Sequence, residues 1–252
     1  MRIFVENTVE DLGRKAADLA AAEISKAIHE KGSARIVLST GASQITTLQY
    51  LVKKDVRWDC VTMFHLDEYI NLPETHNASF RKYLKERFTN IVHPKEIFFV
   101  KGEGDIAANI DELTKELRKE PIDVALIGIG ENSHIAFNDP PADFNTREAF
   151  ITVNLDDACK RQQLGEGWFE SIDDVPKQAI SMTVYQIMQS KVIISSVPGK
   201  SKAEAVYKTL LSERLTPIIP ATMLKEHKNW TLFLDKDSAS MTDRGLLHSK
   251  ES

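Results

Sequence analysis

Short apolar runs alternate along this chain with longer segments of helical pattern. The runs that predict strands are rich in branched and aromatic residues, and they cover residues 35–38, 61–64, 97–100, 124–127, 192–195 and 231–234. Strands that alternate with helices are typical of a mostly parallel sheet. The sequence therefore predicts an α/β fold: an open, Rossmann-like, mostly parallel sheet with helices on both faces.

The segments between the runs predict helices. Thr8 is a typical N-cap for a helix that continues to about Glu30 and is closed by Gly32. Further helices are predicted over residues 43–52, 79–88, 110–118, 184–189 and 201–211. Two stretches without periodicity, 139–144 and 157–176, predict long loops, which are often functional in compact domains. The polar tail, residues 237–252, predicts a frayed end.

Length and charge restrict the class of protein. A chain of 252 residues with a net charge of −5 predicts a single domain (1–252) with no generic affinity for nucleic acid or anionic membranes. Its two cysteines, Cys60 and Cys159, form no CxxC pair, which argues against a disulfide framework or a cysteine zinc site. Since the N-terminus lacks the apolar stretch of a signal peptide, a cytoplasmic protein is expected.

Residues 39–44 leave a predicted strand and enter a predicted helix. Gly41 permits a tight turn, and the hydroxyls of Ser39, Thr40 and Ser43 join the free backbone amides of the helix start, including that of Ala42. Such a turn suits a phosphate. It matches neither the Walker A loop nor the dinucleotide fingerprint. The alternative is an ordinary strand-to-helix turn.

Two acids follow the strand predicted at residues 61–64. Asp67 and Glu68 are adjacent, so in extended backbone they point in opposite directions and only one can face a cleft. A carboxylate there could abstract a proton from a carbon next to a carbonyl. The alternative is a solvated loop acid. His65 has no motif partner and is interpreted as structural.

Residues 128–140 form the most informative segment. Gly128 and Gly130 allow a tight turn at the end of a buried strand, and His134 and Asp139 follow. Ligands bind at the carboxyl ends of strands in open parallel sheets. An imidazole beside a carboxylate at that place suggests proton-transfer chemistry, although a structural histidine is the alternative.

Two basic residues could close on a phosphate. Arg161 lies in an irregular segment, and Lys202 lies in the first turn of a predicted helix, where the helix dipole slightly disfavours a cation. That cost favours an anion-binding role for Lys202. The alternative for both residues is an ordinary surface charge.

These motifs together resemble the glucosamine-6-phosphate deaminase (isomerase) family. The resemblance spans about residues 10 to 240 and rests on residues 64–72 and 128–140, on the 39–44 loop, on Lys202-Ala203, and on 221–227 followed by 231–235. The stretch His-Ile-Ala-Phe-Asn-Asp-Pro that begins at His134 is the most specific part. The related 6-phosphogluconolactonases share the glycines and the histidine but usually continue with Thr-Ala-Ser.

The resemblance implies a reaction and a role for each residue. An amino-sugar 6-phosphate, of gluco or galacto type, would undergo ring opening and aldose–ketose isomerisation with loss of ammonia, without metal or organic cofactor. His134 would assist ring opening, Asp139 would orient its imidazole, and Asp67 would move a proton between carbons 2 and 1. The phosphate would be held by residues 40–43, Lys202 and Arg161.

The chain departs from the family pattern around the histidine. Asn132 and Asp139 stand where the family usually has Asp and Glu, and Ser133 replaces the usual Gly. Asn132 can still orient a neighbouring group by hydrogen bonding, although it carries no charge. The segment 161–169 is longer than its counterpart in the typical deaminase. These differences leave the particular amino sugar open.

Three other functions are compatible with parts of the sequence. A lactonase of the 6-phosphogluconate type needs activated water and no carbon-acid base, so Asp67 argues against it. A sugar-phosphate-sensing module would need neither Asp67 nor His134, and no basic helix-turn-helix is evident. A soluble α/β protein without assignable activity is what composition alone supports. The expected partner is a small sugar phosphate, with homo-oligomerisation left open.

Overall fold

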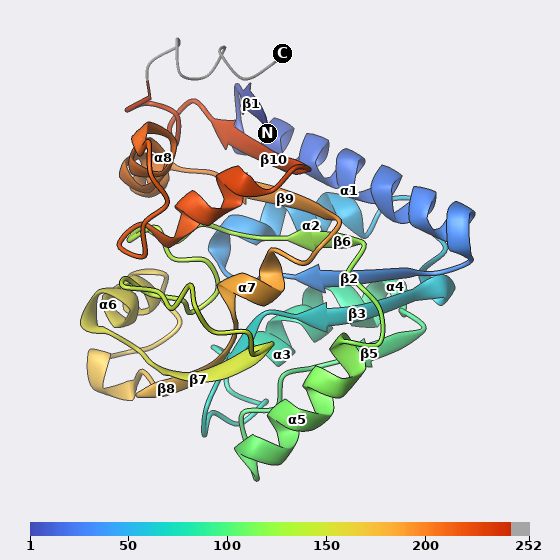
Figure 1. Cartoon of the computed structure of the whole chain (residues 1–252), viewed down its shortest axis with the longest axis horizontal. Helices are drawn as coiled ribbons and strands as arrows, with labels where there is room; N and C mark the ends of the chain where they lie inside the picture. The colour runs from blue at the N-terminus through green and yellow to red at the C-terminus, as the bar shows by residue number, and fades with distance from the viewer. Residues whose placement is uncertain (243–252) are drawn as a thin grey trace.

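The computed structural model describes residues 1–242 and contains a seven-stranded sheet in which every neighbouring pair of strands is parallel (Figure 1). The strands, in spatial order, are β1 (Arg2–Glu6), β10 (Trp230–Asp235), β9 (Val192–Val197), β6 (Val124–Leu126), β2 (Ala34–Leu38), β3 (Val61–His65) and β5 (Glu96–Phe98). The six predicted strands and the parallel α/β fold are confirmed. β1 was not predicted, because three of its five residues are exposed at the sheet edge.

Alternate residues of the central strands feed two separate hydrophobic cores. In β2, Ile36 and Leu38 pack on one face and Val37 on the other. The first face is covered by α1 (Val9–Lys31), α2 (Ile45–Leu51) and α3 (Phe80–Leu84), and the second by α5 (Ile106–Leu117), α7 (Val184–Ile187) and α8 (Ala203–Leu211). Helices therefore cover both faces, as predicted for a parallel sheet.

The ends of α1 follow from its sequence. The Thr8 hydroxyl accepts a hydrogen bond from the amide of Asp11 (3.1 Å), and Gly32 closes the helix in the left-handed conformation (φ 81°). These are the two cap signals that predicted the helix. Shorter 3₁₀, π and α segments also occur: Ala42–Gln44, Trp58–Cys60, Lys85–Thr89, α4 (Asn90–Val92), Lys200–Lys202 and Pro220–Glu226.

A second, antiparallel sheet lies beside the carboxyl ends of the main strands (Figure 1). Its order is β4 (Asp67–Tyr69), β8 (Gln178–Met182) and β7 (Phe150–Asn154). One residue separates β3 from β4, so the chain passes directly from the main sheet into the small one. None of these strands was predicted, because β4 has only three residues, two of them acidic, and no long apolar run marks the other two.

The predicted loop at 157–176 is wrong over its first half. Residues Asp157–Gly165 form helix α6, capped by Asp156, whose carboxylate accepts a hydrogen bond from the amide of Cys159 (2.6 Å). Only Cys159 and Gln163 of this helix are buried, so no apolar stripe marks it in the sequence. Ile172–Asp174 adds a single 3₁₀ turn. The tail predicted at 237–252 lies outside the described residues from 243 onward.

Candidate active site

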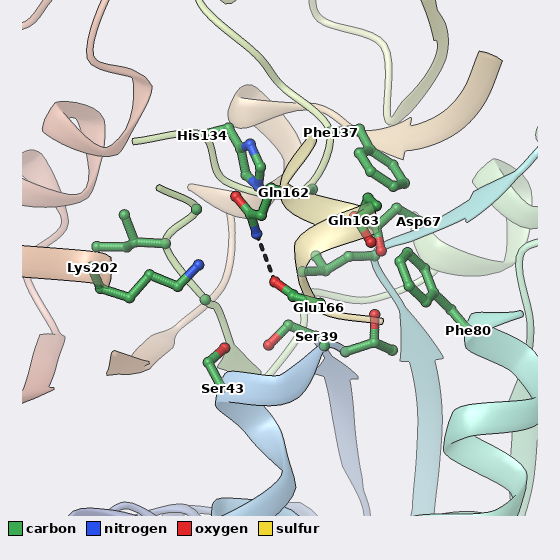
Figure 2. Close-up of a pocket in the computed structure, with 17 residues that line it drawn as sticks. Ser39, Ser43, Asp67, Phe80, His134, Phe137, Gln162, Gln163, Glu166 and Lys202 are labelled. Atoms are coloured by element: carbon green, nitrogen blue, oxygen red, sulfur yellow. Dashed lines mark hydrogen bonds between the residues drawn. The ribbon is translucent and has the colours of Figure 1, made fainter. Parts of the chain in front are cut away.

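A pocket lies where β2, β3, β6 and β9 of the main sheet end, and α6 covers it (Figure 2). Most of the residues predicted for the site line it: Ser39, Thr40, Gly41, Ser43, Asp67, Gly130, His134 and Lys202. Apolar side chains, Leu66, Phe80 and Phe137 among them, complete its wall. Residues distant in sequence meet here because the carboxyl ends of parallel strands share one edge of the sheet.

His134 is held by hydrogen bonds within its own loop. Its Nδ1 lies 2.9 Å from Oδ1 of Asp139, and its backbone amide donates to Oδ1 of Asn132 (3.1 Å). The Asn132 amide group in turn donates to Oδ1 of Asp139 (3.0 Å). Asn132 therefore orients the carboxylate and not the ring itself. With Nδ1 fixed, Nε2 is the nitrogen available to a ligand.

Gly130 leaves room for the imidazole of His134. A Cβ at this position would stand 2.2 Å from Nε2 of His134, so any side chain would displace the ring. The same loop contains two non-glycine residues in the left-handed region, Ser133 (φ 70°) and Ala136 (φ 50°). Such conformations cost of order 1–3 kcal/mol each and are typical of functional sites. A glycine at position 133 would adopt this conformation without that cost.

The surroundings of Asp139 favour its ionised form. Burial raises the pKa of this carboxyl, but hydrogen bonds and charge interactions, above all with His134, bring its pKa below the ordinary value. His134, Asp139 and Cys159 offer ligand atoms within 4.8 Å of one another, the arrangement of the described residues most like a metal site. Burial, however, raises the pKa of the Cys159 thiol, and the thiolate is the form that binds metal.

Asp67 and Glu68 point to opposite sides of β4, as predicted. Asp67 lines the pocket beside Phe80 and Phe137, and it is 6% exposed. Burial, and to a smaller degree the charge of Glu68, raises the pKa of Asp67 well above its ordinary value. A carboxyl with a raised pKa is a stronger base once it is ionised.

Glu68 is instead a structural acid. Its carboxylate pairs with Nε of Arg81 (3.0 Å) and accepts a hydrogen bond from the Ser79 hydroxyl (2.9 Å). The amides at the start of α3 also donate to it. His65 is structural too, as predicted: it is fully buried, its Nδ1 accepts from the amide of Val100 (3.3 Å), and burial lowers its pKa to about 3.

The anion group of the pocket, residues 39–43 together with Lys202, carries hydrogen-bond donors without partners. Gly41 adopts φ 92°, which turns the chain out of β2. The Ser39 hydroxyl is buried and has no hydrogen-bond partner. Lys202 is 6% exposed, and its ammonium forms no ion pair or hydrogen bond within residues 1–242. Burial lowers the pKa of Lys202, while the charges of Glu166 and Glu131 partly oppose that shift.

Helix α6 supplies pocket residues that the sequence did not reveal. Gln162 and Gln163 line the pocket, and so does Glu166, which follows the helix. The one sequence signal for this helix was Asp156, a typical N-cap residue. Arg161, predicted to contact phosphate, is exposed and lines a neighbouring hollow beyond Glu166, outside the pocket itself.

One protein family matches most of the chain. Residues 7–233 match the family described as glucosamine-6-phosphate isomerases/6-phosphogluconolactonase. The chain is 36% identical to a glucosamine-6-phosphate deaminase of Streptococcus equi subsp. equi over 84% of this chain and 89% of that one. It is 33% identical to a glucosamine-6-phosphate deaminase of Lactobacillus delbrueckii subsp. bulgaricus over 96% and 99% of the two chains.

Solved structures show the same fold. A monomeric glucosamine-6-phosphate deaminase, described as a missing link of the NagB superfamily, superposes with a TM-score of 0.86 at 31% identity, over 96% of this chain and 100% of that one. A 6-phosphogluconolactonase from Shewanella baltica superposes with a TM-score of 0.77 at 20% identity, over 93% and 97% of the two chains. At that identity the second likeness concerns the fold alone.

Proposed function

Because this chain belongs to the glucosamine-6-phosphate isomerase/6-phosphogluconolactonase family, we propose that it is an amino-sugar 6-phosphate deaminase. The substrate would be glucosamine 6-phosphate or its galacto epimer, and the products a ketose 6-phosphate and ammonia. One observation carries the proposal: Asp67 and His134 line one pocket that also contains the unpartnered cation Lys202. A carbon-acid base, a ring-opening group and a phosphate site are thus combined.

The reaction assigns a step to each catalytic residue. His134 relays a proton between the C1 hydroxyl and the ring oxygen, so that the sugar ring opens to the free aldehyde. Asp67 then removes the proton from C2 and returns it to C1, while a proton passes from the amine nitrogen to the C1 oxygen, so that C1 carries a hydroxyl and C2 an imine. Water adds to that imine, and ammonia leaves. The balance is one amino sugar and one water giving one ketose and one ammonia.

The surroundings of both residues fit these roles. Asp139 holds the Nδ1 side of His134, so that Nε2 can exchange protons with the substrate. The raised pKa of Asp67 brings its basicity nearer to that of the intermediate it must protonate. An anchored phosphate would fix the distance from the anion group to carbons 1 and 2, and such positioning is a large part of catalysis.

The proposal takes residues 1–252 as one catalytic domain that acts in the cytoplasm without metal or organic cofactor. No helix within residues 1–242 is long and apolar enough to cross a membrane. A contact between Arg161 and the phosphate stays a prediction. The residue lines a neighbouring hollow and not the pocket itself. Activity that persists after treatment with a chelator is expected.

A substrate panel tests the proposal. The purified full chain is assayed for ammonia release from glucosamine 6-phosphate and galactosamine 6-phosphate, and for hydrolysis of 6-phosphogluconolactone. Ammonia from either amino sugar, lost in the Asp67→Asn variant, is the expected result. Lactone hydrolysis without ammonia release would favour the lactonase instead. Binding of the sugar phosphates without any turnover would favour the sensing module.

A further inference from the structure

Glu166 places a carboxylate against the loop predicted to bind phosphate. Its Oε2 lies 3.4 Å from the amide nitrogen of Ala42, which donates to it. The same oxygen lies 3.6 Å from where a Cβ of residue 41 would stand. Figure 2 shows the side chain reaching into the pocket above Ser39 and Ser43. The pocket thus already contains an anion beside its anion group.

The position of this carboxylate is defined by neighbours on its own segment. Gln162 donates from Nε2 to Oε1 of Glu166 (2.9 Å), and Trp168 donates from Nε1 to Oε2 (3.0 Å). Trp168 packs edge-on against Tyr83, whose hydroxyl donates to the carbonyl oxygen of Gly41 (2.9 Å). The segment that bears Glu166 is therefore fastened to the same loop that the carboxylate contacts.

Lys202 and Ser39 show that the carboxylate fits the anion group only in part. The charge of Glu166 raises the pKa of Lys202, against the larger effect of burial, but the ammonium forms no hydrogen bond or ion pair within residues 1–242. The buried Ser39 hydroxyl also has no partner. A phosphate has three acceptor oxygens and nearly two charges at neutral pH, so it can satisfy donors that a carboxylate leaves free.

We propose that Glu166 is a resident anion that competes with the substrate's phosphate for the anion group and that the phosphate must displace when it binds. This inference rests on the proposed function, because it assigns a phosphate to that group. A phosphate dianion gains contacts that repay the displacement. A sugar without phosphate has no group that could take the place of the carboxylate, so Glu166 stays on the loop.

Displacement of Glu166 would also be felt by the catalytic residues. Gln162 accepts through Oε1 from the amide of Glu131 (3.0 Å), and Gln163 accepts through Oε1 from the hydroxyl of Tyr69 (2.7 Å). Tyr69 is a neighbour of Asp67 on β4. When Glu166 leaves the loop, α6 can shift, and these contacts with it. Binding of the phosphate is thereby linked to the arrangement around the base.

The test compares two glutamates of one segment. Glu166→Gln removes the charge and keeps one acceptor oxygen, which can serve Gln162 or Trp168 but not both, whereas Glu170→Gln neutralises an exposed acid that does not line this pocket. Binding of inorganic phosphate to the full chain is measured by calorimetry. Since the variant no longer places a negative charge beside the bound phosphate, Glu166→Gln is expected to bind phosphate at least about tenfold more tightly, and Glu170→Gln within about twofold of wild type.

Two further measurements keep the result unambiguous. Glu166→Ala should tighten phosphate binding in the same direction, and thermal melting checks that both variants fold. In wild type, phosphate should change the Trp168 fluorescence, a change that Trp168→Phe removes. Unchanged or weaker phosphate binding in folded Glu166→Gln and Glu166→Ala would overturn the inference.

The outcome is independent of whether the deaminase proposal holds. Phosphate binding needs no turnover, so tighter phosphate binding by Glu166→Gln, with no ammonia release by wild type, would refute the proposed function and keep the inference about Glu166. Ammonia release by wild type, with the same KM and the same phosphate affinity in Glu166→Gln as in wild type, would support the proposed function and overturn the inference about Glu166. An unphosphorylated amino sugar should gain little from either variant, because it has no group to place beside Lys202.

Discussion

His134 and Lys202 line the same pocket, yet their surroundings differ in kind. The nitrogen of His134 that faces away from the ligand is held by Asp139, which Asn132 holds in turn. Lys202 and Ser39 have no such partners within residues 1–242. The proposed proton-transfer group is thus held in place before a ligand binds, whereas Lys202 and Ser39 keep donors free for a ligand. Groups that transfer protons need fixed orientation, and groups that bind charge need free donors.

Both arrangements lower the stability of the fold, by different means. The loop of residues 128–140 contains left-handed backbone at Ser133 and Ala136. The anion group contains a buried, unpaired ammonium, which costs desolvation energy. Substitutions on the two sides should therefore affect activity and stability in distinguishable ways, and the expected effects range from a loss of catalysis to a small gain in stability.

Asp67→Asn should abolish deamination. The amide cannot accept the C2 proton, and general acid–base catalysis contributes roughly 10²–10⁴-fold, so kcat should fall by about 10³ or more. Inorganic phosphate should bind as in wild type, because the anion group is untouched. Ammonia release and calorimetry on one preparation check both points. Full activity of this variant would show that Asp67 is not the base.

Asp139→Asn should reduce kcat by roughly 100-fold, since it removes a charge that fixes the ring and supports the imidazolium. KM should change little, because Asp139 does not line the pocket. The deficit should be smaller on an open-chain analogue than on the cyclic sugar, since the role proposed for His134 is in ring opening. Equal deficits on both substrates would show that Asp139 acts beyond the ring-opening step.

Lys202→Met should act mainly on binding. Loss of a charge-assisted contact of about 1.5–3 kcal/mol predicts a KM for the amino-sugar phosphate raised roughly 10- to 100-fold, with kcat less affected. The variant should also melt at a higher temperature than wild type, because a buried unpaired cation is replaced by an apolar chain. Steady-state kinetics and melting curves check that substrate binding weakens while the melting temperature rises. A lower melting temperature would mean that Lys202 is paired in solution.

The pH dependence of stability should distinguish Asp67 from Glu68. Because the folded state raises the pKa of Asp67, its favourable contribution is present below pH 3.8 and is lost as the pH rises through the folded pKa. Asp67→Asn should therefore be more stable than wild type at pH 8, by about 1–3 kcal/mol, and equal to it near pH 3.8.

Glu68→Gln is the matched control for that comparison. It removes the buried carboxylate that pairs with Nε of Arg81 and leaves this guanidinium paired with more exposed acids, chiefly Glu103 through Nη2 (2.9 Å), so it should lose stability at pH 8 where Asp67→Asn gains it. Denaturant unfolding at both pH values checks the pair. The activity of wild type should rise over the same pH range in which the Asp67 carboxylate forms.

The sequence predicted the parts of the structure that follow from local patterns of residues. The six main strands and the residues that follow them were predictable, because a buried strand is an apolar run and its carboxyl end locates the site. The opposite orientation of Asp67 and Glu68 followed from strand geometry alone. The sequence predicted that Gly130 belongs to the site, but not that a side chain there would collide with the His134 ring.

Helix α6 shows where the sequence was insufficient. Its residues are mostly polar and only two of its side chains are buried, so no periodicity marks it. Glu166 meets Ala42 across 124 positions of the chain, and no local pattern reports such a contact. Secondary structure with an apolar face is therefore predictable in this chain, whereas a polar segment positioned by its contacts with the site is not.

The smallest expected effect is on backbone strain at Ser133. With φ at 70°, Ser133→Gly should relieve a left-handed conformation and stabilise the fold by about 1 kcal/mol, after the greater entropy of glycine in the unfolded chain is subtracted. That corresponds to a rise in melting temperature of roughly 2–4 °C for a chain of this size. Activity should stay close to wild type, because the loop keeps its path.

Ser212→Gly provides the control, since Ser212 has φ −57° and its hydroxyl donates to the carbonyl oxygen of Arg214 (2.7 Å). Glycine there removes a contact and relieves no strain, so this variant should melt at a lower temperature. A loss of stability in Ser133→Gly as well would mean that the Ser133 side chain contributes more than its backbone costs. The rigidity of the catalytic loop would then come from packing, and the contrast with the unpartnered anion group would rest on hydrogen bonds alone.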